Sequence, residues 1–403
     1  MENIDEKLEF ELAEDETEYD YRPEISKFSE AVIWGTDWTT ETIARQLKKG
    51  NIDLNPTFQR RDAWSDVEKS KLIESLMLGI PVPPIILAEN KDKNNSYLVI
   101  DGKQRLLSIR RFYSDLSEQD SFKQLKLKGL EILNNLNGLT YQEIEDNYNE
   151  FITNIDNQSI RTIVIKNWPD EDFLYTVFLR LNTGSKKLSP QELRQALKPG
   201  PFLSYLDEAT ANSTIIKKML KNKRPDPRMK DIELSLRFFA FKYNIESYNG
   251  NLKVFLDDTC ELLNNSWSEK EEEIVELFFE LEKAIEFSYG LFPKNPFSRY
   301  RKGICNNKFN RAIFEIFSYY FSDPSIRRCI GEKQEEFIDE FIKLNDDSDF
   351  ISAVSNTTKD VNRIIIRYNK FSDLLSTLCA DKEIKIKRFI LNEYRIEIEE
   401  VTS

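Results

Sequence analysis

The strongest constraint on the fold of this 403-residue chain is a strand that runs directly into a helix through a polar turn. Residues 96–100 (SYLVI) are an apolar run typical of a buried strand. Residues 106–112 (LLSIRRF) have the spacing of a helix with one apolar face. Between them stand Asp101, Gly102, Lys103, Gln104 and Arg105. The pattern predicts a small α/β unit in which a helix begins where a strand ends.

Such a turn suits an anionic ligand. The first N–H groups of a helix have no partner within the helix, and the helix dipole favours negative charge there. Arg105 is placed to clamp a phosphate group, and Asp101 to bind a metal ion or act as a base. In a purely structural alternative, Asp101 caps the helix and pairs with Arg105. The local sequence is compatible with both.

Few glycine and proline residues, 12 and 14, favour a helix-rich α+β architecture. We predict an acidic, disordered leader at 1–28, a small α/β domain at 30–200, an all-helical domain at 201–380 and a tail at 381–403. The tail alternates apolar and charged residues, so it fits either a strand or a frayed helix.

Local signals place the individual elements. Two capping boxes, at Ser65–Glu68 and Ser189–Glu192, predict helix starts. Residues 34–40 are expected to lead into a short helix at 41–49, and a mostly helical insertion is expected at about 117–158. Further strands are predicted at 85–88 and 162–165, and further helices at 229–243, 268–289, 308–321 and 359–379.

The chain contains no histidine. This excludes, within this chain, an HNH nuclease centre, the Ser-His-Asp and Cys-His triads, and histidine-ligated zinc or iron. Any chemistry must use carboxylates, Arg, Lys, Tyr, hydroxyl groups and a hard metal ion such as Mg²⁺ or Mn²⁺. The four cysteines are widely spaced and form no CxxC pair, so we predict buried free thiols. No apolar run approaches the length of a membrane span, so we expect a cytoplasmic protein with no membrane partner.

The net charge of −13 is unevenly distributed. Residues 1–24 hold eleven acidic residues against two basic ones, a local charge of −9, and the remainder carries only −4. We expect the leader to be a solubilising tail. The sharper alternative is a tail that competes with phosphate for a basic groove.

Two basic stretches are candidates for a nucleic-acid surface. Residues 217–230 carry seven basic side chains against one acidic residue, and residues 291–311 carry six against none, with aromatic residues between them. Positive charge with aromatic rings fits backbone contact and base stacking, although solvated helix faces are the simpler interpretation. The predicted DNA contacts are Lys223, Arg224, Arg228, Arg299, Arg301 and Lys302.

Several motifs occur in a fixed order: Gln59-Arg60 with Trp64, then 76–84 (LMLGIPVPP), DGKQR at 101–105, 178–184 (FLRLNTG) and 188–193 (LSPQEL). In this order they resemble the N-terminal domain of GmrSD-type restriction enzymes, which carries a DGQQR motif on a fold similar to the ParB and sulfiredoxin group. The resemblance extends from about Asp37 to Asn369 and includes 228–234 (RMKDIEL) in the helical half.

The resemblance implies binding and hydrolysis of nucleoside triphosphates in bacterial defence against foreign or modified DNA. GmrSD-type enzymes add a C-terminal HNH nuclease domain, which this chain does not match. Lys103 also replaces the first glutamine of the usual motif, adding a cation beside the phosphate site. Both departures favour a stand-alone sensor or a subunit that acts with a separate nuclease or defence protein.

We therefore expect an NTP-hydrolysing, nucleotide-binding module of an anti-phage or modification-dependent restriction system. Asp101, Arg105 and Gln104 are the predicted catalytic residues, with Asp101 also positioning Mg²⁺ or the attacking water. The predicted nucleotide-binding residues are Gln59, Arg60, Gly102, Lys103, Arg180 and Asn182. Two alternatives remain open: a non-catalytic DNA-binding or regulatory module, and a metal-dependent nickase that uses the ParB-like pocket.

Overall fold

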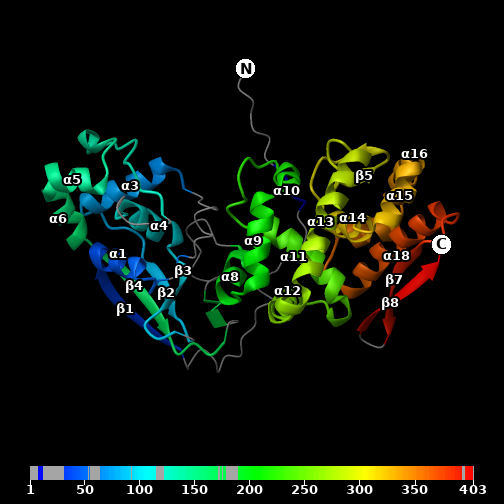
Figure 1. Cartoon of the computed structure of the whole chain (residues 1–403), viewed down its shortest axis with the longest axis horizontal. Helices are drawn as coiled ribbons and strands as arrows, with labels where there is room; N and C mark the ends of the chain where they lie inside the picture. The colour runs from blue at the N-terminus through cyan, green and yellow to red at the C-terminus, as the bar shows by residue number, and fades with distance from the viewer. Residues whose placement is uncertain are drawn as a thin grey trace, which may run out of the picture. The chain divides into compact units, whose positions relative to one another are not determined.

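The computed structural model describes residues 8–11, 31–52, 54, 64–91, 93–114, 122–170, 173–174, 176–177, 189–392 and 395–402. The chain divides into two compact units. One is formed by Tyr21–Leu197 and the other by Met1–Asp20 together with Lys198–Ser403. The division at Leu197 lies close to the boundary expected at residue 200. The helix-rich α+β class is confirmed (Figure 1).

A four-stranded mixed sheet forms the base of the first unit (Figure 1). The strand order is β1-β4-β2-β3. Strand β2 pairs parallel with β4 and antiparallel with β3, and β1 pairs antiparallel with β4. The strands are β1 (Val32–Thr39), β2 (Ile85–Glu89), β3 (Tyr97–Asp101) and β4 (Ser159–Lys166).

The centre of the sheet is buried on both faces. Ile86 and Ala88 join a core cluster with Leu193, while the alternate residues Ile85 and Leu87 point to the opposite face and are equally buried. This explains why β2 reads in the sequence as a continuous apolar run.

Residues 34–39 do lead into the first helix as expected, and they form strand β1, which the sequence did not predict; Thr40 is already the first residue of α1. Most of β1 is exposed, with Ile33 67% and Trp34 55% accessible. An exposed edge strand needs no alternation of buried and polar residues, so its sequence carries no strand signal.

The helices of this unit pack against one another beside the sheet (Figure 1). Helix α4 contacts both α1 and α3, and α6 contacts the same two helices. The insertion predicted to be mostly helical is irregular over 122–133 and becomes helical only beyond it. The helices are α1 (Thr40–Lys48), α3 (Asp66–Met77), α4 (Lys103–Phe112), η3 (Asn134–Leu136), α5 (Tyr141–Asn147), α6 (Asn149–Asn157) and α8 (Pro190–Leu197).

Both predicted capping boxes are present. The Ser65 hydroxyl accepts the N–H of Glu68, whose carboxylate accepts the N–H of Ser65 at 2.8 Å. Ser189 and Glu192 repeat the arrangement at 2.7 and 3.1 Å.

The second unit is built from helices and two small hairpins, and the four helices predicted between 229 and 379 are confirmed. The helices are α9 (Pro201–Asn212), α10 (Thr214–Met219), α11 (Lys230–Tyr243), η4 (Ile245–Ser247), α12 (Leu252–Asn265), α13 (Trp267–Leu291), α14 (Arg311–Phe321), α15 (Pro324–Glu332), α16 (Gln334–Leu344), α17 (Ser348–Ser355) and α18 (Val361–Leu378). The hairpins pair β5 (Tyr300–Arg301) with β6 (Ile304–Cys305) and β7 (Lys385–Asn392) with β8 (Arg395–Thr402).

The C-terminal tail is therefore a hairpin, which resolves the choice between strand and frayed helix. Its Phe389 ring lies 4.5 Å from Tyr368 and 5.5 Å from Tyr319, centroid to centroid. This packing joins β7 to the aromatic core of the unit, because alternate residues of the strand face inward.

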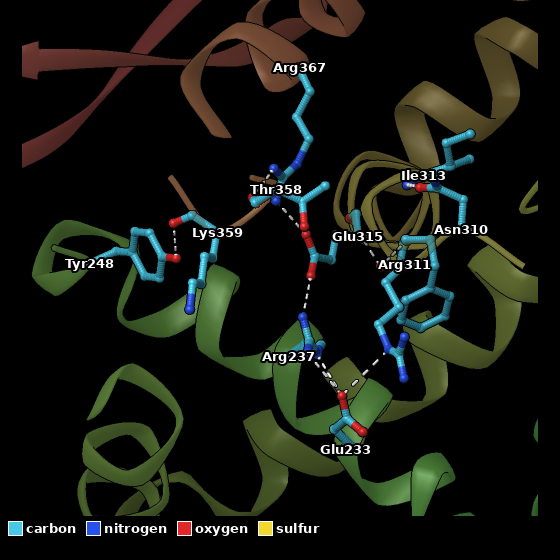
Figure 2. A network of polar contacts seen from close by, with 12 residues as sticks. Glu233, Arg237, Tyr248, Asn310, Arg311, Ile313, Glu315, Thr358, Lys359 and Arg367 are labelled. Carbon is cyan, nitrogen blue, oxygen red and sulfur yellow. Dashed lines mark hydrogen bonds and ion pairs between the residues drawn. The ribbon is translucent and has the colours of Figure 1, made fainter. Parts of the chain in front are cut away.

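A buried ion network ties α11, α14 and α18 together (Figure 2). Glu315, 4% exposed, accepts hydrogen bonds from Arg237 at 3.0 Å and from Arg367 at 2.6 Å. Arg237 also donates to Glu233 at 3.0 Å, and the Arg311 Nε atom lies 3.6 Å from the same carboxylate. Removing one member of a buried ion pair typically costs ~3–5 kcal/mol, so this network fixes the relative positions of the three helices.

The cysteine prediction is wrong in part. Cys329 in the last turn of α15 and Cys379 directly after α18 form a disulfide, whereas Cys260 and Cys305 remain thiols. The two partners are 50 residues apart in sequence, so spacing alone gave no signal of their approach. Within the described part of the chain, no helix has both the length and the apolar character to cross a bilayer.

Glu74 is the residue by which α3 holds the irregular segment that follows residue 130. It is 5% exposed and accepts the N–H groups of Glu131, Ile132 and Leu133 at 2.7–3.2 Å. Burial alone raises the pKa of Glu74, but these three donors outweigh burial and hold the pKa below its ordinary value of 4.5.

We expect Glu74→Ala to lower the free energy of unfolding by on the order of 3 kcal/mol, because three backbone N–H donors, one of them buried, lose their acceptor. Urea denaturation followed by tryptophan fluorescence measures this. Trp34, Trp38, Trp64 and Trp168 are in the first unit and only Trp267 is in the second, so the signal reports mainly on the first unit. A depressed carboxyl pKa stabilises above about pH 4.5 and its contribution is lost as the pH falls. Between pH 5 and pH 3, the Glu74→Gln variant should therefore lose less stability than the wild type does. The same pH dependence of stability in both proteins would contradict this role of Glu74.

We expect the denatured protein to present two reactive thiols without reductant and four after reduction. A disulfide closing a loop of this length contributes roughly 4 kcal/mol, so reduction should also lower the denaturation midpoint of the second unit. Thiol titration in guanidinium chloride measures the count. Four reactive thiols before reduction would show that the bond does not form.

Candidate functional site

The turn between β3 and α4 is built around a buried glycine. Asp101 is the last residue of β3 and pairs with Ile86 beside an irregularity in the register. Gly102 follows at φ 99°, where L side chains are strained, and it is buried. A Cβ atom there would lie 3.1 Å from the Ile85 side chain and 3.2 Å from that of Arg105. Glycine is therefore needed for both backbone conformation and space.

The residue at the N-cap position of α4 supplies no side-chain hydrogen bond, because it is a glycine. Gly102 stands at the cap position, and its carbonyl accepts the N–H of Leu106 at 2.9 Å. The structural alternative for this turn is thus half correct: Asp101 pairs with Arg105 but does not cap the helix.

Arg105 is 8% exposed and its guanidinium is anchored on one side only. Its Nη2 atom donates to Asp101 Oδ2 at 2.9 Å and to the Pro84 carbonyl at 3.1 Å. Its Nε atom is buried and has no hydrogen-bond acceptor in the part of the chain that the structure describes. A buried donor without an acceptor costs about 1–3 kcal/mol, so an oxygen acceptor placed beside Nε would stabilise the guanidinium.

Lys103 and Gln104 complete the first turn of α4. Lys103 is 7% exposed, and its Nζ atom lies 3.8 Å from a Glu192 carboxylate oxygen. The capping box holds Glu192 at the start of α8, so the second motif of the unit lies beside the first. Gln104 is half-buried, and its backbone carbonyl accepts a hydrogen bond from Ser108 at 2.7 Å.

At the C-terminal end of α4, the buried Arg111 donates all of its described hydrogen bonds to oxygen atoms of the protein itself. Arg111 donates to Asp66 at 3.0 Å and to the Lys123 carbonyl at 2.8 Å. Burial by itself raises the pKa of Asp66, but Arg111, with Lys69 and Lys128, outweighs burial and holds the pKa below its usual value. Arg111 therefore serves to join α3, α4 and the irregular segment.

The second half of the predicted pocket is not described. Gln59, Arg60, Arg180 and Asn182 lie outside the described residues. Their convergence on Asp101 and Arg105 therefore stays a prediction. Among described residues, no group of three His, Cys, Asp or Glu side chains is arranged to hold a metal ion. Asp101 is the single predicted metal ligand whose position is known.

The predicted DNA-contacting residues fall in the second unit. Lys223 and Arg224 are exposed and Arg228 is half-buried, all in the segment that precedes α11. Arg301 and Lys302 are exposed on the β5–β6 hairpin. Arg299 differs from these, because its Nε atom is bound at 2.7 Å by Glu11 of the leader.

Sequence reasoning missed a small pocket of the second unit that is lined by members of the buried network, which Figure 2 shows. Its polar lining includes Arg237, Arg311 and Arg367 beside Glu315. The one signal in the sequence was the 228–234 motif, which contains Glu233, the partner of Arg237 and Arg311. Because these groups bind one another, the arrangement is first of all a structural brace.

Comparison with known proteins supports the assignment of the first unit. Residues 41–197 match the model of the GmrSD restriction endonuclease, N-terminal domain. The match ends where the structure divides, so it does not include the 228–234 motif of the second unit. No curated protein and no solved structure matches the chain. Residues 41–197 are therefore similar to the N-terminal domain of the GmrSD restriction endonuclease.

Proposed function

We propose that residues 41–197 form a nucleotide-binding, NTP-hydrolysing module of a DNA-directed restriction or defence system. The observation that carries the proposal is the buried Nε donor of Arg105 in the first turn of a helix that begins at a glycine. The family match supports the restriction context. DNA and a separate nuclease or defence subunit are the partners we propose for the whole assembly.

Arg105 is suited to recognise phosphate because its anchoring leaves part of the guanidinium for a ligand. Asp101 and Pro84 engage Nη2, while Nε has no acceptor within the described residues. A phosphate oxygen supplies an acceptor for Nε and neutralises charge at the start of α4. By contrast, Arg111 already uses both Nε and Nη1 for protein oxygens, so we assign it no ligand role.

Lys103 is proposed to change partners when nucleotide binds. Its distance of 3.8 Å from Glu192 is long for a charge-assisted hydrogen bond, although both groups are buried. A triphosphate carries more negative charge than one carboxylate, so the ammonium group is expected to contact it. Gln104, on the same turn, is proposed to orient the nucleotide through its amide.

Asp101 is proposed to position the attacking water, using a carboxylate held by Arg105. Mg²⁺ or Mn²⁺, when bound, would neutralise the phosphate charge. One carboxylate with phosphate oxygens and waters is a usual Mg²⁺ environment, so the lack of a larger described cluster is compatible with it. The nickase alternative would use the same aspartate. The two hypotheses are therefore distinguished by testing the substrate, nucleoside triphosphate or DNA, and not by replacing a different residue.

We expect Asp101→Asn to reduce phosphate release from nucleoside triphosphate at least ~100-fold while nucleotide affinity changes only a few-fold. Asparagine keeps an acceptor for Arg105, whereas alanine would leave a buried guanidinium without its carboxylate and destabilise the turn. Asp37→Asn is the matched control, because it breaks an Asp–Arg pair at the opposite edge of the sheet, with Arg161 at 3.1 Å. Phosphate release and calorimetric binding are measured with ATP and GTP, with and without Mg²⁺. Equal turnover in Asp101→Asn and the wild type would remove the catalytic role, and plasmid nicking lost in the variant would favour the nickase.

We expect Arg105→Lys to weaken nucleotide binding by roughly 10–100-fold, because lysine keeps the charge but supplies no Nε donor. The control is Arg161→Lys, whose side chain is 60% exposed in the same unit. Isothermal titration calorimetry compares the two variants, and thermal unfolding checks that both fold. Parallel affinities in the two variants would show that Arg105 is only a structural partner of Asp101.

A further inference from the structure

A short part of the leader pairs with the second basic stretch. The N–H of Glu11 donates to the Phe309 carbonyl at 2.9 Å, and the N–H of Phe309 donates to the Glu9 carbonyl at 2.8 Å. Phe10 and Phe309 thus form a parallel β-bridge across almost 300 residues of sequence. Both segments belong to the same unit, so the contact is part of its fold.

Glu11 is held as an internal anionic ligand. Its side chain is 9% exposed, and its two carboxylate oxygens accept from Arg299 Nε at 2.8 and 2.7 Å. The amide of Asn310 donates to the same group at 2.8 Å, and so does the amide of Asn306. Asn310 also caps α14, so the carboxylate lies beside the positive end of that helix.

Phe10 lies where the two basic stretches meet. Its ring centroid is 4.9 Å from that of Phe309, 4.7 Å from the Arg311 guanidinium carbon and 4.3 Å from the Lys230 ammonium nitrogen. Arg311 in turn lies 3.6 Å from Glu233, which Arg237 holds in place (Figure 2). The buried network therefore presents a preorganised cation to whatever occupies the position of Phe10.

An aromatic ring followed by an anion is also the chemical description of a nucleotide. We propose that the surface formed by Lys230, Arg299, Phe309, Asn310 and Arg311 is a single-stranded nucleic-acid site that Glu9-Phe10-Glu11 occupies in the free protein. A base takes the place of the Phe10 ring on Phe309, and a phosphate takes the place of the Glu11 carboxylate. This inference lies beyond the proposed nucleotide site, because it concerns another unit and another ligand.

Charge favours a polyanion as the competing ligand. Residues 217–230 and 291–311 carry thirteen basic residues against one acidic residue, whereas the docked leader segment supplies only two carboxylates. The exposed side chains of Arg301 and Lys302 extend the positive surface beyond the docked segment. A tethered segment competes at high effective concentration, which explains how a three-residue segment with two carboxylates can screen the site until a longer polyanion arrives.

The test is fluorescence polarisation with a labelled oligodeoxythymidine of about 15 nucleotides, using the full chain. Glu9→Gln with Glu11→Gln should raise its affinity about tenfold over the wild type. The matched control, Glu271→Gln with Glu272→Gln on exposed positions of α13, removes the same charge and should leave the affinity near that of the wild type. Phe10→Ala should act in the same direction as the leader pair. Adding Arg299→Gln to the leader pair should cancel its gain.

Hydrogen exchange supplies a second measurement that does not depend on variants. Saturating oligonucleotide should accelerate exchange at the Glu11 N–H, because the leader leaves its place. The proposal is overturned by equal affinities of the leader pair and the control pair, by the absence of binding in all variants, by equal affinity for duplex DNA, or by a Glu11 N–H that stays protected at saturation.

Discussion

Both units are organised by the need to provide acceptors for buried guanidinium groups. A charge removed from water is tolerated only when it is paired and hydrogen-bonded, because desolvation costs several kcal/mol per ion. In the first unit, α4 buries Lys103, Arg105, Arg110 and Arg111, and their partners come from several other parts of the fold. Pairing thereby sets where α3, α8 and the loop before β2 must lie.

The second unit solves the same problem with Glu315 and Glu233, which bind Arg237, Arg311 and Arg367. Among the described residues, three guanidinium groups contact these two carboxylates. Arg311 also faces the Phe10 ring. The structural brace and the proposed nucleic-acid surface are therefore one electrostatic system, in which the brace orients the cation that the surface presents.

The two ends of α4 illustrate the difference between a structural and a functional arginine. Arg111 has protein acceptors for both of its hydrogen-bonding sides, while Arg105 has an acceptor for Nη2 and none described for Nε. Apolar spacing alone treats the two residues alike, and the sequence distinguished Arg105 only by its place in the DGKQR motif. The acceptors available to each side chain in three dimensions supply the physical difference between them.

The sequence by itself determined the elements that depend on local forces. The strand–turn–helix at 96–112, the capping boxes at Ser65 and Ser189 and the long helices follow from apolar spacing and from hydrogen bonds within three or four residues. The ordered motifs also indicated the family whose model matches residues 41–197.

Only the tertiary structure decided the features that depend on distant parts of the chain. The exposed strand β1 forms because β4 offers it a partner, and the Cys329–Cys379 bond joins helices 50 residues apart. Likewise, the acidic leader finds Arg299 and Phe309 at the other end of the sequence. The local sequence does not indicate these contacts. Their free energy comes from strand pairing, disulfide formation and ion pairing between segments that only folding brings together.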